Sequence, residues 1–174
     1  EPIKLLKLLY VIKSLIYMQP LQFGLFYSEE MKKFIIDRAS DYDVIFCYHM
    51  RSIQYLPEHF YGKKIIEMGD LISDNYKQTF YSLNIFNPFK YIFFLESLFV
   101  KKIEKKILNN FDKIILFSKN EIKKIDKLFL KKIVHINVSI DKIKRKYFFS
   151  KDNSKILFIG NYSDCFLLGL FFIS

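Results

Sequence analysis

The chain has 174 residues, is 51% hydrophobic and 26% charged, and carries a formal net charge of +10, so it can bury a core and is not a disordered tail. Only Arg38, Arg51 and Arg145 are arginines and all other basic residues are lysines. Without an Arg-rich motif this disfavours nucleic-acid binding and indicates a solvated lysine surface or attraction to an anionic membrane. The two cysteines lack metal-ligand spacing, and no stretch reaches the roughly 20 uncharged apolar residues of a membrane span.

Residues 2–18 place apolar side chains at helical spacing, with lysines on the remaining face. This pattern predicts a basic amphipathic helix. Such a helix either packs on a core or lies on anionic lipid, and the sequence leaves both interpretations open. Pro20 ends the helix, and the apolar run Leu21 to Tyr27 is expected to form a strand.

From residue 28 onward, helical patterns alternate with apolar runs. Ser28 is a plausible N-cap for a helix to about Ser40, and Ser118 opens a capping box with Glu121 before a helix to about Phe129. Pro88 opens a long helix to about Asn110. The other expected elements are strands at 43–48, 63–68, 112–117 and 133–138, a short helix at 51–59 and a loop at 69–76.

This alternation predicts an α/β fold with a Rossmann-like, mostly parallel sheet and helices on both faces. Residues 139–154 are polar and basic and are interpreted as a linker. The run 155–160 is a sixth strand, which is expected to open a second domain that residues 161–174 do not complete. Residues 1–138 then form the first domain.

Three polar clusters follow predicted strands, and in parallel sheets ligands gather at the carboxyl ends of the strands. His49 and Arg51 follow the second predicted strand and could bind phosphate or carry a proton; alternatively they are ordinary loop residues. Asp70 and Ser73 follow the third and could act on a hydroxyl, or simply serve a turn. Ser118 follows the fourth, where helix capping is a sufficient explanation. No glycine-rich dinucleotide motif, P-loop or HExxH is present.

Several stretches, in this order, resemble the N-terminal half of GT-B glycosyltransferases, and most closely the family-4-like sugar transferases of bacterial exopolysaccharide clusters. Glu67 stands where that family has an aspartate, and the turn at 137–141 lacks the family's glycine. The stretches that carry the resemblance are Tyr42-Asp-Val-Ile-Phe-Cys-Tyr-His-Met-Arg51, Ile65-Ile-Glu-Met-Gly-Asp-Leu-Ile-Ser-Asp-Asn-Tyr76, Phe94-Leu-Glu96 with Ile103-Glu104, Phe111-Asp-Lys-Ile-Ile-Leu-Phe-Ser118, Ile136-Asn137 to Asp141 and Ile156-Leu-Phe-Ile-Gly-Asn-Tyr162.

The resemblance implies sugar transfer from a nucleotide-sugar to a glycan or lipid-linked acceptor, without a metal or other cofactor. It implies that Asp70 orients the acceptor hydroxyl, that His49 is the second catalytic candidate, and that Arg51, Ser73 and Ser118 bind substrate. The family's first strand and its donor domain are expected to be missing from this chain, so we expect the fragment to be inactive alone.

The expected location is cytoplasmic, with residues 2–18 docking on the inner membrane face. Two alternatives remain open at this point. One is a non-catalytic α/β binding module, and the other is a peripheral membrane protein whose function resides in residues 2–18.

Overall fold

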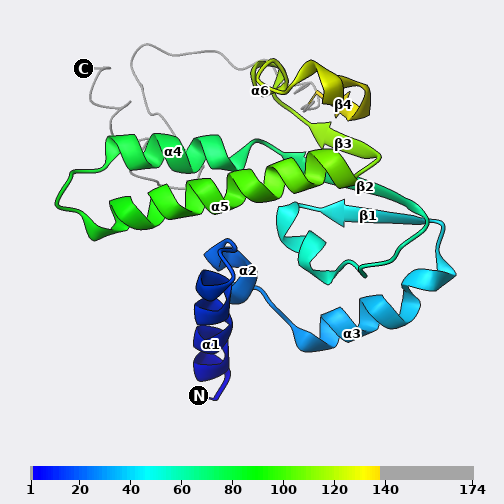
Figure 1. Ribbon diagram of the computed structural model, residues 1–174, viewed down its shortest axis with the longest axis horizontal. Coiled ribbons are helices and arrows are strands. Elements are labelled where there is room, and N and C mark those ends of the chain that lie inside the picture. The colour runs from blue at the N-terminus through cyan, green and yellow to red at the C-terminus, as the bar shows by residue number, and fades with distance from the viewer. Residues whose placement is uncertain (1, 138–174) are drawn as a thin grey trace, which may run out of the picture. The chain divides into compact units, whose positions relative to one another are not determined.

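The computed structural model describes residues 2–137, and within them four strands form one parallel sheet (Figure 1). The strands lie in the order β1-β2-β3-β4, which is also their order in the chain. The predicted α/β class with a parallel, Rossmann-like sheet is therefore confirmed. The linker 139–154 and the strand 155–160 lie outside the described residues. The strands are β1 (Val44–Tyr48), β2 (Lys63–Gly69), β3 (Lys113–Leu116) and β4 (Ile133–His135).

The helices begin where the sequence offers capping side chains. Ser28 Oγ accepts a hydrogen bond from the Met31 amide at 3.2 Å, and Asn87 Oδ1 accepts one from Phe89 N at 2.9 Å just before Pro88, which satisfies otherwise unpaired first-turn donors. The α-helices are α1 (Pro2–Ile16), α2 (Leu21–Leu25), α3 (Glu29–Arg38), α4 (Ile72–Ser82), α5 (Pro88–Asn110) and α6 (Lys119–Ile122); the 3₁₀ helices are η1 (Ala39–Asp41), η2 (Met50–Tyr55) and η3 (Lys127–Lys132).

Three expectations about local structure are wrong. The run after Pro20 forms helix α2 instead of a strand, because Gly24 lets it pack directly against the backbone of α1. The expected loop 69–76 contains the first turn of α4, which starts at Ile72. The helix after Ser118 ends at Ile122 because Asp126 starts a new turn, its carboxylate accepting a hydrogen bond from Leu128 N at 3.0 Å.

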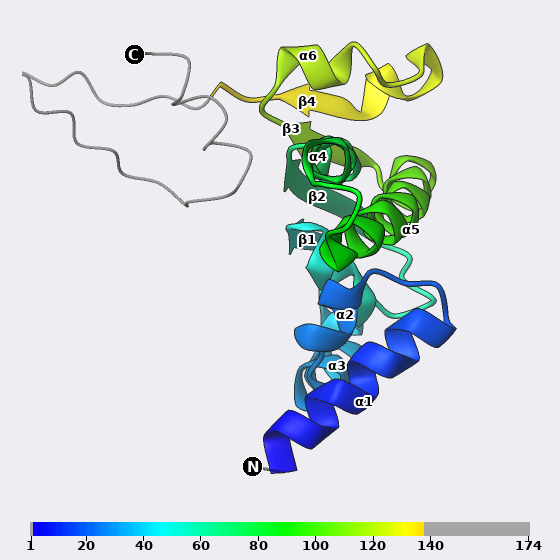
Figure 2. The same cartoon turned by 90° about the vertical axis from the view of Figure 1, so that its left-hand side faces the viewer.

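The core lies on one face of the sheet. Parallel strands that follow each other across a sheet by right-handed crossovers keep all their connections on the same face. Accordingly, alternate strand residues are buried against the α5 side chains Val100, Ile103 and Ile107. Among residues 2–137 the connecting helices follow this face only, so the prediction of helices on both faces is wrong for this part of the chain: Val44, Phe46 and Tyr48 on the other face of β1 are exposed. Figure 2 shows α1, α2 and α3 beyond the β1 edge. The buried strand residues are Cys47, Ile66, Met68, Ile114 and Leu116.

Helix α1 contacts the rest of the described chain through its less apolar side. Ser14 is only 4% exposed, and its hydroxyl donates to the Tyr10 carbonyl oxygen at 3.1 Å. The leucines and isoleucines of the opposite side remain exposed, so the apolar face does not pack on the core. Within residues 2–137 none of the helices combines the length and the apolar character needed to cross a membrane. The exposed apolar residues of α1 are Leu6, Leu8, Leu9, Ile12, Leu15 and Ile16.

Candidate functional site

The carboxyl ends of the four strands bring the predicted site residues to one edge of the sheet. His49 follows β1, Asp70 follows β2 and Ser118 lies two residues after β3. Main-chain bonds continue the ladder past the strands: His49 N donates to the Glu67 carbonyl oxygen at 2.8 Å, and Phe117 N donates to that of Gly69 at 3.0 Å. The positions of these three residues are therefore fixed by the sheet itself.

His49 has an unusual backbone conformation. Its φ of 64° and ψ of 151° lie in a region that is almost restricted to glycine. The strain is held by Ser52, whose amide and hydroxyl both donate to the His49 carbonyl oxygen, at 3.1 and 2.8 Å. Strained non-glycine residues of this kind cluster at functional sites, which supports the predicted role of this position.

The His49 side chain is polar, half-buried and available. Its Nδ1 is buried and has no hydrogen-bond partner among residues 2–137. Burial lowers the pKa of the imidazole, and the neighbouring Arg51 charge lowers it further. A lowered pKa favours the neutral form of the ring, in which one nitrogen can accept a hydrogen bond.

Arg51 supplies a positive charge beside His49. Its guanidinium carbon lies 4.3 Å from the centroid of the Phe26 ring on the loop after α2, a cation–π contact that orients the group. Within the described chain it makes no hydrogen bond or ion pair. A half-buried, oriented guanidinium without a carboxylate partner is suited to binding an anion such as a phosphate.

Tyr76 on α4 lies near Arg51, and Glu96 on α5 lies near Tyr76. The pKa of Tyr76 is raised by burial and by Glu96, and lowered in part by the Arg51 charge. Glu96 is 6% exposed, and its Oε1 accepts a hydrogen bond from Leu21 N at 2.7 Å. Burial raises the pKa of its carboxyl group, which this hydrogen bond partly offsets. Glu96 thus anchors the start of α2, which leads to Phe26.

Carboxylates surround the start of α4, next to Asp70. Glu104 accepts hydrogen bonds from the Ser73 amide at 3.0 Å and from its hydroxyl at 2.5 Å, and both residues are buried. Glu121 accepts one from Leu71 N at 3.0 Å. Negative groups at a helix N-terminus satisfy its free amides and its dipole. The exposed Asp70 is left facing solvent beside this cluster.

Two predicted site residues already have hydrogen-bond partners in the structure. The Ser73 hydroxyl donates to Glu104, and Ser118 Oγ caps α6 by accepting from Glu121 N at 3.4 Å. The substrate-binding roles predicted for both serines stay predictions. The edge therefore brings together two sets: His49 and Arg51 at β1, and Asp70 with the acidic cluster at β2. In the part of the chain described, no three His, Cys, Asp or Glu side chains are grouped as a metal site.

Glu96 and Glu104 have no predicted role beyond their place in the resemblance. Both lie on the buried stripe of α5, eight residues apart, among Val100, Ile103 and Ile107. A carboxylate in an apolar stripe needs a buried partner. The glutamates in the apolar stripe of α5 were therefore the sequence signal for buried hydrogen bonds. The partners themselves, Leu21 and Ser73, are set by tertiary packing and have no local signature.

Comparison with known proteins adds no family to these observations. No protein-family model matches the chain, and neither a curated protein nor a solved structure matches it. Any functional statement must therefore come from the fold and from the arrangement of side chains at the carboxyl edge of the sheet.

Proposed function

We propose that this chain is the acceptor-side part of a GT-B glycosyltransferase, similar to the family-4-like enzymes of bacterial exopolysaccharide synthesis. Such an enzyme transfers a sugar from a nucleotide-sugar to a hydroxyl of a glycan or lipid-linked acceptor. The observation that supports this best is the placement of His49, Arg51 and Asp70 after adjacent parallel strands, at the edge where such folds bind ligands.

The chemistry of these groups suits an acceptor that carries phosphate next to a sugar. Arg51, oriented by Phe26 and without an ion-pair partner among residues 2–137, would bind the phosphate. Asp70 would accept a hydrogen bond from the attacking hydroxyl and direct its lone pair at the anomeric carbon of the donor. The bond from that carbon to the nucleoside diphosphate breaks as the new glycosidic bond forms, and the hydroxyl proton passes to Asp70 or to water. His49 would contact the acceptor through the exposed part of its half-buried ring.

The first prediction concerns acceptor binding. The chain should bind a short-chain prenyl diphosphate-linked sugar, and Arg51→Gln should weaken this binding about 10- to 100-fold, the effect of losing one charge-assisted hydrogen-bonded contact. Isothermal titration calorimetry measures it. Asp70→Asn should leave this binding within about threefold, because its role lies in orienting the hydroxyl.

Arg38→Gln is the matched control, since Arg38 also stacks on a phenylalanine, with its guanidinium carbon 5.3 Å from the Phe34 centroid, but lies on α3. Equal weakening by both arginine variants would show a general charge effect and would contradict the site. Sugar transfer is not expected from this chain alone, so acceptor binding decides. Absence of acceptor binding would remove the proposal.

A second candidate function, peripheral membrane binding, is favoured by the exposed apolar face of α1. Leu8, Ile12 and Leu15 are 54%, 43% and 45% exposed and lie on one side of the helix, and Lys13 lies next to that side. An apolar face with lysines beside it is the pattern of helices that lie in the interface of anionic membranes. Both functions are compatible, because a lipid-linked acceptor would reach the enzyme from such a surface.

The second prediction is salt-sensitive binding to vesicles that contain phosphatidylglycerol. The variant Leu8→Ser with Ile12→Ser should reduce the partition coefficient at least tenfold, because it removes apolar area from the face that enters the interface. Vesicle co-sedimentation measures it. Leu128→Ser is the control, since Leu128 is 76% exposed but lies on η3. Binding that is unchanged by salt and by the α1 substitutions would contradict this function.

A further inference from the structure

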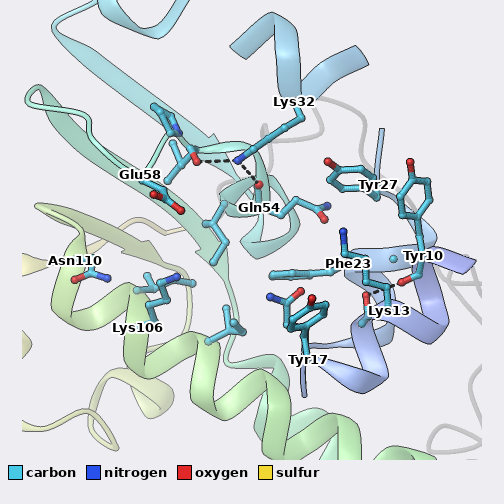
Figure 3. A pocket seen from close by; sticks show the side chains of 18 of the residues that line it. Tyr10, Lys13, Tyr17, Phe23, Tyr27, Lys32, Gln54, Glu58, Lys106 and Asn110 are labelled. Atoms are coloured by element: carbon cyan, nitrogen blue, oxygen red, sulfur yellow. Dashed lines mark hydrogen bonds between the residues drawn. The ribbon is translucent and has the colours of Figure 1, made fainter. Parts of the chain in front are cut away.

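A pocket lies away from the carboxyl ends of the strands. It encloses about 810 Å³ and is bounded by α1, α2, η2 and α5 (Figure 3). Lys64 at the start of β2 and Phe111 just before β3 line it, so it opens at the amino ends of the strands. Its volume lies in the range of small-molecule sites, roughly 300–1,000 Å³. The proposed acceptor site does not use any of this space.

The walls of the pocket are strongly basic. Lys13, Lys32, Lys64 and Lys106 line it, against a single glutamate, Glu58. They come from α1, α3, β2 and α5, so the fold collects lysines that are far apart in the sequence. Like charges gathered around one cavity repel each other unless an anion neutralises them.

Most of these ammonium groups are available. Lys32 Nζ donates to the carbonyl oxygens of Gln54 and Leu56, each at 3.0 Å, as the dashed lines in Figure 3 show. Lys13 and Lys106 make no side-chain hydrogen bond or ion pair with residues 2–137. In Figure 3 they lie on different sides of the pocket, on α1 and α5. Each lysine therefore offers an ammonium group to a ligand from its own side of the pocket.

The pocket also contains an unused donor and aromatic surface. Gln54 Nε2 is buried and has no partner in the described part of the chain, and a buried donor of this kind needs an acceptor. The rings of Tyr10 and Tyr27, with centroids 4.7 Å apart, line the same space beside Phe23. Such walls suit an apolar or ring-shaped moiety attached to an anion.

We propose that this pocket binds a phosphate ester, with Lys13 and Lys106 contacting the ester from different walls and its organic moiety lying against Gln54 and the tyrosines. Lysines act on phosphate as point charges. A phosphate ester carries one to two negative charges, so it neutralises several lysines better than a ligand with a single carboxylate does. The ester is either a free phosphorylated metabolite or the headgroup of an anionic lipid. This inference does not depend on the proposed sugar transfer.

The test uses the full chain and glycerol phosphate as the soluble probe, with binding followed by ³¹P NMR line broadening and calorimetry. The double variant Lys13→Gln with Lys106→Gln should weaken binding at least tenfold. Its control is Lys77→Gln with Lys127→Gln, which removes the same charge from exposed lysines outside the pocket. Equal weakening in both double variants would overturn the proposal, because it would report net charge only.

Gln54→Leu provides a second variant of similar volume, with circular dichroism to confirm that it folds. It should weaken binding severalfold without changing the net charge. Phosphatidylglycerol vesicles form the other arm: weakened vesicle binding by Lys106→Gln alone, which lies on α5 and not on the membrane-binding helix α1, with no binding of soluble glycerol phosphate, identifies a lipid headgroup. Binding of soluble glycerol phosphate that the pocket variants weaken identifies a free phosphate ester. No pocket-dependent binding in either arm overturns the proposal.

Discussion

Replacing Glu104 with alanine is expected to lower the free energy of unfolding by about 4 kcal/mol. The carboxylate accepts hydrogen bonds from both the amide and the hydroxyl of Ser73, and both residues are buried. Removing one partner leaves two buried donors unsatisfied, at roughly 1–3 kcal/mol each, and opens a cavity beside α4. Urea unfolding followed by circular dichroism measures the change.

Glu104→Gln is the matched variant for this prediction. Its side-chain oxygen can still accept from the Ser73 amide, and its NH₂ can donate to the Ser73 hydroxyl oxygen, so the expected loss is only about 1 kcal/mol. If glutamine costs as much as alanine, the hydrogen bonds to Ser73 are not what the carboxylate contributes, and the prediction is wrong.

The pH dependence of the same two proteins tests the electrostatics. Burial raises the pKa of the Glu104 carboxyl group, an effect that the hydrogen bonds from Ser73 only partly offset. A group whose pKa is higher in the folded state than in the unfolded state stabilises the fold most when it is protonated. The stability of the wild type relative to Glu104→Gln should therefore rise as the pH falls through the raised pKa toward the unfolded value. A relative stability that falls over this range would contradict the raised pKa.

The first three strands could be predicted because each is built around a short run of apolar residues. The expected strands at 43–48, 63–68 and 112–117 correspond to β1, β2 and β3 within one residue at each end. The run of β1 is apolar without alternation, as in parallel strands, although Val44, Phe46 and Tyr48 are exposed on the face that the helices of residues 2–137 leave uncovered. The capping serines Ser28 and Ser118 were also predictable, because capping is local chemistry.

Contacts between distant elements were not predictable in the same way. The short apolar run after Pro20 fits a strand or a helix equally well. Only its packing on α1 determines that it forms a helix. The site shows the same limit. His49, Arg51 and Asp70 follow strands, so their shared edge follows from topology, whereas the support of Arg51 by Phe26 joins segments 25 residues apart. No periodicity of apolar residues in the sequence predicts that contact.

Gly24→Ala is expected to destabilise the protein by about 3 kcal/mol, against the general trend for helices. Alanine in a helix is normally more favourable than glycine by roughly 1 kcal/mol. Here a Cβ at position 24 would lie 2.4 Å from the Tyr10 carbonyl oxygen and 2.6 Å from the Val11 nitrogen. These are backbone atoms of α1, so the clash is relieved only by moving one helix away from the other, and overpacking of this kind costs typically 1–3 kcal/mol.

The displacement should also reach the basic pocket, because α1 supplies Tyr10 and Lys13 to its wall. We expect Gly24→Ala to weaken glycerol phosphate binding while acceptor binding at Arg51 changes less. Leu25→Ala is the control on the same helix, since Leu25 is 48% exposed and should lose well under 1 kcal/mol. A Gly24→Ala protein as stable as the wild type would mean that α1 and α2 do not meet at this glycine. The α1 wall of the pocket depends on that contact, so this result would also contradict the proposed phosphate site.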